Sequence, residues 1–66
     1  MTKYFHIVQV HPVYNGILQT HKVRGEREFD DKVKADNWIK SFNEFAGSDE
    51  RAVYYGCVND ETGELV

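Results

Sequence analysis

The chain has 66 residues, a net charge of −3 and a single cysteine, and these properties exclude several classes of protein. Eleven Asp and Glu against eight Lys and Arg argue against the nonspecific phosphate attraction of basic nucleic-acid binders, and Cys57 alone cannot form a disulfide within the chain. No apolar run approaches the roughly 20 residues of a membrane span, so we expect one small domain over residues 1–66, cytoplasmic and without membrane contact.

Two runs of β-forming residues flank an Asn-Gly pair and predict a β-hairpin. Residues 4–10 and 17–23 are rich in aromatic and β-branched side chains. Between them, Asn15 and Gly16 tolerate the positive φ that a type I′ turn requires. Pro12 lacks an N–H group, and we therefore place it at the mouth of the turn rather than deep in the ladder.

Three histidines lie in this hairpin and raise the question of a metal site. Alternate side chains of a strand point to opposite faces, so His6 and His11, five positions apart, do not share a face. A two-residue loop places His21 opposite Val10, also away from His11. A three-residue loop with a bulge places His21 opposite Gln9 and diagonal to His11. Two ligands at most result, fewer than zinc requires, and we expect no metal and no cofactor.

A helical period follows the hairpin and predicts one amphipathic helix. Asp30 is the expected N-cap, Phe29 and Val33 brace the first turn, and Gly47 is a suitable stop. The apolar positions recur at spacings of three and four. They are Ala35, Trp38, Ile39, Phe42, and Phe45 or Ala46.

Strand character returns at residues 51–58 and completes a β-β-α-β layout. Residues 59–66 predict a tight turn with Gly63 near the left-handed region, then a short fourth strand. A right-handed helix crossover places the third strand beside the first and antiparallel to it, in the order 2-1-3. We predict an α+β fold, in which one amphipathic helix packs on one face of a small antiparallel sheet.

No local signature of catalysis is present. Cys57, His11 and Asp60 are candidates for nucleophile, base and orienting group, but no spacing joins them, and a strand thiol is expected to pack as a small apolar group. The five glycines stand singly and form no phosphate-binding loop. We expect neither enzymatic activity nor a small-molecule substrate.

The first strand carries more apolar residues than one helix covers. They occur at both odd and even positions, so part of the set is expected to stay exposed or meet a partner. We predict a protein-binding module that acts through this open sheet face and the edge of the second strand, as a homodimer or as a ligand of a larger protein. The expected partner-binding residues are Phe5, Ile7, Lys22, Arg24 and Tyr55.

A single-stranded nucleic-acid-binding protein is the alternative. Lys22, Arg24 and Arg27 cluster on and just beyond the second strand, and the sheet aromatics offer faces on which bases stack. The acidic total and the interleaved Glu26 and Glu28 weigh against this function.

In size and layout, the whole chain resembles small accessory proteins encoded by phages and mobile elements. The resemblance has no diagnostic residues, so it transfers no residue roles. It implies a protein that binds a host protein and inhibits or redirects it.

Overall fold

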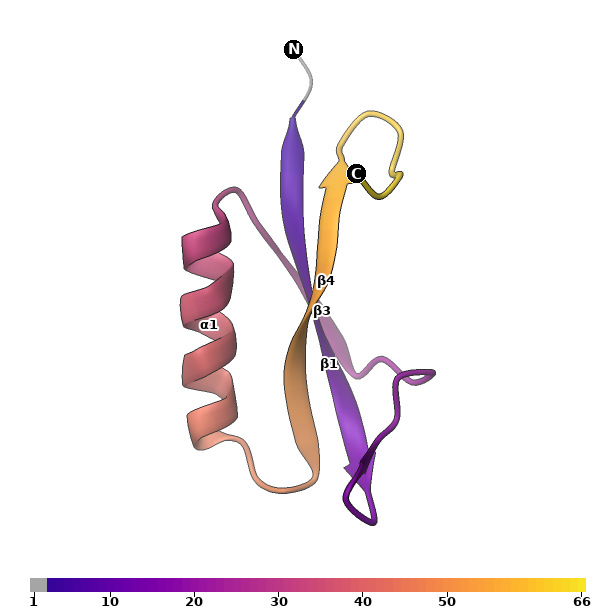
Figure 1. Ribbon diagram of the computed structural model, residues 1–66, viewed down its shortest axis with the longest axis vertical. Helices are drawn as coiled ribbons and strands as arrows, with labels where there is room; N and C mark the ends of the chain where they lie inside the picture. The colour runs from indigo at the N-terminus through magenta and orange to yellow at the C-terminus, as the bar shows by residue number, and fades with distance from the viewer. Residues whose placement is uncertain (1–2) are drawn as a thin grey trace.

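The computed structural model describes residues 3–66 as a four-stranded antiparallel sheet with one helix on one face (Figure 1). In chain order the elements are β1 (Tyr4–Tyr14), β2 (Ile17–Leu18), β3 (Gly25–Phe29), α1 (Lys32–Phe45) and β4 (Glu50–Asn59). β1 is central and pairs antiparallel with each of the other strands. The predicted α+β fold is confirmed, including the antiparallel pairing of the strand after the helix with the first strand.

The turn of the predicted hairpin forms as expected. Asn15 and Gly16 both have positive φ, at 52° and 76°, which is the combination that a type I′ turn needs. Tyr14 is the partner of Ile17, so the loop contains two residues.

The second hairpin strand is interrupted after two residues. The chain leaves the ladder after Leu18 and rejoins it at Gly25, which pairs with Val10. Both predicted positions of His21 in the ladder are wrong, because residues 19–24 form a loop between β2 and β3. The strand then continues to Phe29, beyond its predicted end at residue 23.

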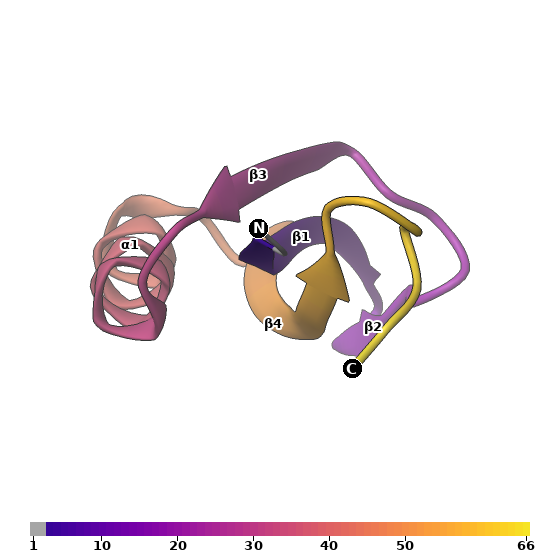
Figure 2. The ribbon, with the colours of Figure 1, turned by 90° about the horizontal axis from the view of Figure 1, so that it is seen from above.

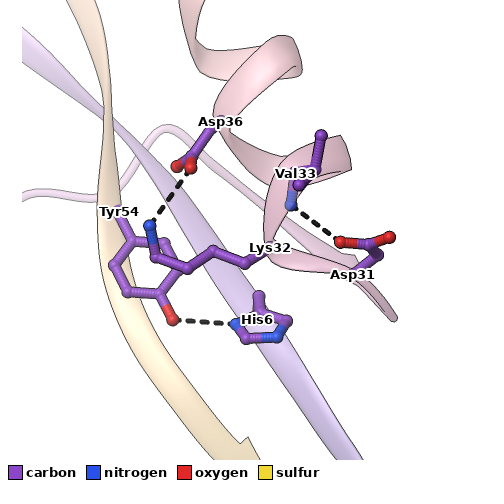
Figure 3. Close-up of polar contacts among 6 residues, drawn as sticks. All are labelled: His6, Asp31, Lys32, Val33, Asp36 and Tyr54. Carbon is purple, nitrogen blue, oxygen red and sulfur yellow. Dashed lines mark hydrogen bonds and ion pairs between the residues drawn. The ribbon is translucent and has the colours of Figure 1, made fainter.

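The N-cap of the helix lies one residue later than predicted. Asp31, rather than Asp30, is the N-cap, and its side chain accepts a hydrogen bond of 2.8 Å from the Val33 N–H (Figure 3). Asp30 instead forms an exposed ion pair of 3.1 Å with Lys34. The helix ends at Phe45 with Ala46 as its C-cap, so Gly47 stands at the predicted stop just after the cap.

The core between the helix and the sheet is small. Val8 and Val10 are buried there, because even-numbered residues of β1 point towards α1. Ala35 and Ala52 are buried opposite them, and their small side chains let the helix approach the sheet closely. Half-buried side chains surround these four, namely Phe29, Trp38, Ile39 and Phe42.

The opposite face of the sheet, which we predicted to be open, is partly covered by the loop of residues 19–24 and by the C-terminal tail (Figure 2). Ile7 lies on this face and is only 6% exposed. Its partner on β4 is Gly56, and a Cβ built there would lie 2.7 Å from Leu65 Cδ2 of the tail. His11, on the same face, is 3% exposed because the loop packs over it.

The C-terminal turn has the predicted geometry but not the predicted strand. Gly63 has a φ of 73°, in the left-handed region. The expected fourth strand is reduced to a single antiparallel bridge between Val58 and Leu65.

Candidate binding groove beside an open strand edge

β3 is an edge strand whose outer backbone groups have no strand partner within residues 3–66. On the far side of the sheet, the Asn43 side chain accepts from Ala52 N–H at 2.8 Å and donates to Ala52 C=O at 3.1 Å. The N–H and C=O groups of Ala52 therefore point away from β1. Val10, its partner on β1, correspondingly points its own N–H and C=O groups towards β3. Because this direction alternates along a strand, Glu26 and Glu28 present their N–H and C=O groups outward.

The outer edge of β4, by contrast, is closed at several points. Besides the contact at Ala52, the C-terminal tail bonds two further residues of this edge. The Val66 N–H donates to the Cys57 carbonyl at 2.8 Å, and the Asn59 N–H donates to the Glu64 carbonyl at 2.9 Å. Within the described residues, β3 is therefore the more accessible sheet edge for an added strand.

A groove of about 560 Å³ lies between β3 and α1, directly beside this open edge. We call it the β3–α1 groove; its apolar wall consists of Val10, Phe29, Trp38 and Phe42. Trp38 and Phe42 are stacked with 5.0 Å between ring centroids, and Phe29 lies 6.1 Å from Trp38. Phe29, Trp38 and Phe42 thus form a continuous aromatic surface that the core leaves half-buried.

The two arginines on the rim of the groove already have partners. Arg24 forms an ion pair of 3.4 Å with Glu50 at the start of β4. The Arg27 guanidinium carbon lies 5.4 Å from the centroid of the Trp38 ring, a cation–π geometry that joins β3 to α1.

The two glutamates of β3 have no ion-pair partner within residues 3–66. Glu26 accepts a hydrogen bond of 3.2 Å from the uncharged Gln9 amide. The side chains of Glu26 and Glu28 are both exposed. The open edge therefore carries two negative charges beside its free backbone groups.

The aromatic surface continues beyond the groove towards the end of the helix. Phe45 is 89% exposed and lines a neighbouring hollow together with Trp38 and Phe42. We call these three residues the aromatic stripe. Spacings of four and three residues place them on one side of α1, and large exposed aromatics next to a groove are typical of protein-binding surfaces.

Two of the predicted site residues, Arg24 and Lys22, line hollows of the surface. Arg24 lines the β3–α1 groove, and both residues line a second hollow beside the hairpin, with Val23 and Tyr14. Lys22 is exposed, and its carbonyl oxygen accepts a hydrogen bond from His11 Nδ1 at 2.5 Å. These two basic residues stay accessible, as a binding role requires.

The other three predicted site residues lie elsewhere. Phe5 is half-buried and pairs with Val58, and Ile7 is buried. Tyr55, which is 50% exposed, is the extra residue of a β-bulge opposite the step from Ile7 to Val8. On β1, Val10 pairs with Gly25, which is next to Arg24. Phe5 lies about 16 Å along the strand from Val10, at about 3.3 Å per residue. The structure therefore does not join the five residues in one site.

Sequence reasoning assigned Trp38 and Phe42 to the core and did not single out the groove. The available signal was the width of the apolar surface of the helix. Ala35, Ile39 and Phe42 form one line towards the sheet, and Trp38 and Phe45 extend the apolar surface to one side of this line. One helix face against a small sheet cannot bury the whole of this surface.

His6 and His11 form separate hydrogen bonds. His6 Nδ1 lies 2.8 Å from the Tyr54 hydroxyl, and Lys32 packs over the Tyr54 ring while pairing with Asp36 at 3.1 Å (Figure 3). This arrangement ties β1, β4 and the start of α1 together. His21 is exposed in the loop after β2.

The candidate nucleophile and base are also apart. Cys57 pairs with His6, whereas His11 pairs with Arg51, about 16 Å further along β1 at about 3.3 Å per residue. Among residues 3–66, no group of three or more His, Cys, Asp and Glu side chains converges to hold a metal ion.

No family model, curated protein or solved structure matches the chain. Within the described part of the chain, no helix has both the length and the apolar character needed to cross a membrane.

Proposed function

We propose that the chain is a small non-enzymatic protein-binding module that holds its partner in the β3–α1 groove and along the adjoining aromatic stripe. The observation that carries the proposal is the position of the aromatic stripe next to an unpaired strand edge. Trp and Arg are enriched among the residues that dominate binding energy, and Trp38 with Arg27 over its ring supplies both. Of the binding residues expected from sequence, this surface includes Arg24. It lies on the helix side of the sheet, not on the opposite face that was expected.

Charge favours a protein partner over the nucleic-acid alternative. Arg24 is already paired with Glu50, and the Arg27 guanidinium lies over the Trp38 ring. Glu26 and Glu28 lie on the same strand and would repel a phosphate backbone.

The resemblance in size and layout suggests which partner the module meets. We extend the proposal to an accessory protein of a phage or mobile element that binds a cytoplasmic host protein and modulates it. A homodimer is the other form of protein binding, and the negative charges of β3 disfavour it.

Selection from a random-peptide library tests the proposal. The immobilised chain is expected to enrich peptides that also bind in solution. The variant Phe45→Asp places a charge in the aromatic stripe without touching the buried core, so we expect it to weaken these peptides about tenfold or more. Val33→Asp is the matched control, because Val33 is exposed near the other end of the same helix.

Two results would contradict the proposal. One is a set of enriched peptides that bind Phe45→Asp and the wild-type chain equally. The other is tight binding of a single-stranded oligothymidine whose affinity falls steeply with added salt, which is the behaviour of a nucleic-acid-binding protein.

A further inference from the structure

We infer that the segment bound in the β3–α1 groove is an extended strand that adds to β3, with basic side chains at alternate positions and apolar side chains between them. This inference rests on the proposed function, because it identifies the occupant of the same groove. Three features of β3 support it: its free backbone groups, the direction of its side chains and its negative charge.

The backbone of β3 offers hydrogen bonds to a new strand. Glu26 and Glu28 each turn one N–H and one C=O group away from β1, which gives four groups in a row along the edge. An extended segment pairs with such a row through its own main chain, as in other peptide-binding domains that accept an added strand. Because backbone groups on the outer edge of β4 are already bonded, the added strand is expected at β3.

Side-chain direction divides the added strand into two faces. The residues of the added strand that pair with Glu26 and Glu28 point to the same face of the sheet as these two glutamates, which is the face opposite the helix. The residue between them lies opposite Arg27 and points to the helix side, where Trp38 and Phe42 form the wall of the groove. An apolar side chain at this central position is buried against the aromatic wall.

Charge sets the residues on the other face. Glu26 and Glu28 are exposed and outside any ion pair within residues 3–66, so Lys or Arg opposite each of them forms a favourable cross-strand pair. The predicted contact segment therefore reads basic, apolar, basic.

The same charges disfavour a second copy of this chain as the occupant. A two-fold antiparallel pairing of β3 with itself must join the outward groups of Glu26 and Glu28. A pairing that uses the outward groups of both glutamates is centred on Arg27, and it places Glu26 directly opposite Glu28 of the other copy. A pairing shifted towards Gly25 would need the Arg24 N–H, which already donates to the Val10 carbonyl. Like charges directly opposite each other destabilise a sheet, so the edge is suited to a heterologous strand.

A pair of short peptides tests the inference directly. The probe is Val-Lys-Leu-Lys-Val blocked at both ends, and the comparison is Val-Glu-Leu-Glu-Val. Trp38 is the single tryptophan of the chain and lines the groove, so its fluorescence reports binding without a label. We expect the lysine peptide to bind about tenfold or more tightly than the glutamate peptide. Equal or reversed affinity, or no binding of the lysine peptide, would overturn the inference.

Amide hydrogen exchange shows how the peptide binds. Strand addition slows exchange at the Glu26 and Glu28 amides, whereas the Arg27 amide faces β1 and changes little. If the peptide changes Trp38 fluorescence but leaves these two amides unprotected, strand addition is overturned while binding in the groove stands. If library peptides and the lysine peptide both fail to bind, the proposed function fails with it.

Charge reversal supplies a second, independent test. The double variant Glu26→Lys with Glu28→Lys is expected to reverse the preference in favour of the glutamate peptide. The control carries the same change of net charge at two exposed positions away from β3, Glu44→Lys with Glu61→Lys, and keeps the wild-type preference. Equal effects of the two double variants would mean that net charge, rather than the edge of β3, selects the peptide.

Discussion

Asn43 of α1 bonds both backbone groups of Ala52 of β4, accepting from its N–H at 2.8 Å and donating to its C=O at 3.1 Å. The side-chain amide thereby takes the place that a neighbouring strand would occupy. One contact thus docks the helix and blocks part of the β4 edge against another chain.

Replacing Asn43 with Ala is expected to destabilise the fold by about 2 kcal/mol, because two hydrogen bonds to half-buried groups are lost. Asn37→Ala, at an exposed position of the same helix, controls for the change in helix propensity. Urea unfolding of both variants measures the difference. Equal midpoints would show that the contact contributes nothing to stability.

The start of the helix gives a second contrast. Asp31→Ala removes the N-cap bond to the Val33 N–H and is expected to cost about 1 kcal/mol. Asp30→Ala removes only an exposed ion pair with Lys34 and is expected to cost less than about 0.5 kcal/mol. Thermal or urea unfolding ranks the two variants, and a larger loss for Asp30→Ala would place the cap at the residue predicted from sequence.

The C-terminal tail depends on the absence of a side chain at Gly56. Gly56→Ala places a Cβ 2.7 Å from Leu65 Cδ2, so the flexible leucine side chain must move off the sheet. We expect a loss of stability of about 1 to 3 kcal/mol, because an alanine is strained at the φ of 159° that Gly56 adopts, and faster exchange of the Val66 amide, which donates to Cys57. In a Leu65→Ala background, Gly56→Ala is expected to cost less, because the contact with Leu65 is gone and only the strain of an alanine at a φ of 159° remains; an undiminished effect would mean that the two residues are not in contact.

Val8 anchors the small core. Its side chain is fully buried between β1 and α1, so Val8→Ala is expected to cost about 2 kcal/mol from lost burial and a residual cavity. Val33→Ala makes the same change at an exposed position and is expected to stay within about 0.5 kcal/mol of the wild type. Comparable losses in urea unfolding would contradict the core described here.

Much of the fold follows from short-range signals in the sequence. Asn15 and Gly16 specify the turn because both adopt positive φ, and helical spacing specifies α1. The interruption of the second strand is different in kind. Val23 has high strand propensity, and no proline or glycine marks residues 19–24 as a loop, so alternation alone predicts a continuous strand.

The candidate site was harder to predict because it depends on how the helix docks. α1 lies mainly over β4 and β1, and contacts β3 less, which leaves one side of Trp38 open. The coverage of Ile7 depends equally on tertiary structure, since it needs Leu65 to fold back over Gly56. Neither arrangement has a local sequence signal.

The central claim is that a protein partner occupies the β3–α1 groove. The most direct measurement is a nitrogen-15 NMR titration of the chain with a peptide selected from the random library. The account predicts that the largest shifts occur at the Trp38 indole and at backbone amides of Arg24, Glu26 and Glu28. Largest shifts at Phe5 and Tyr55 instead, on the strands away from the groove, would contradict it.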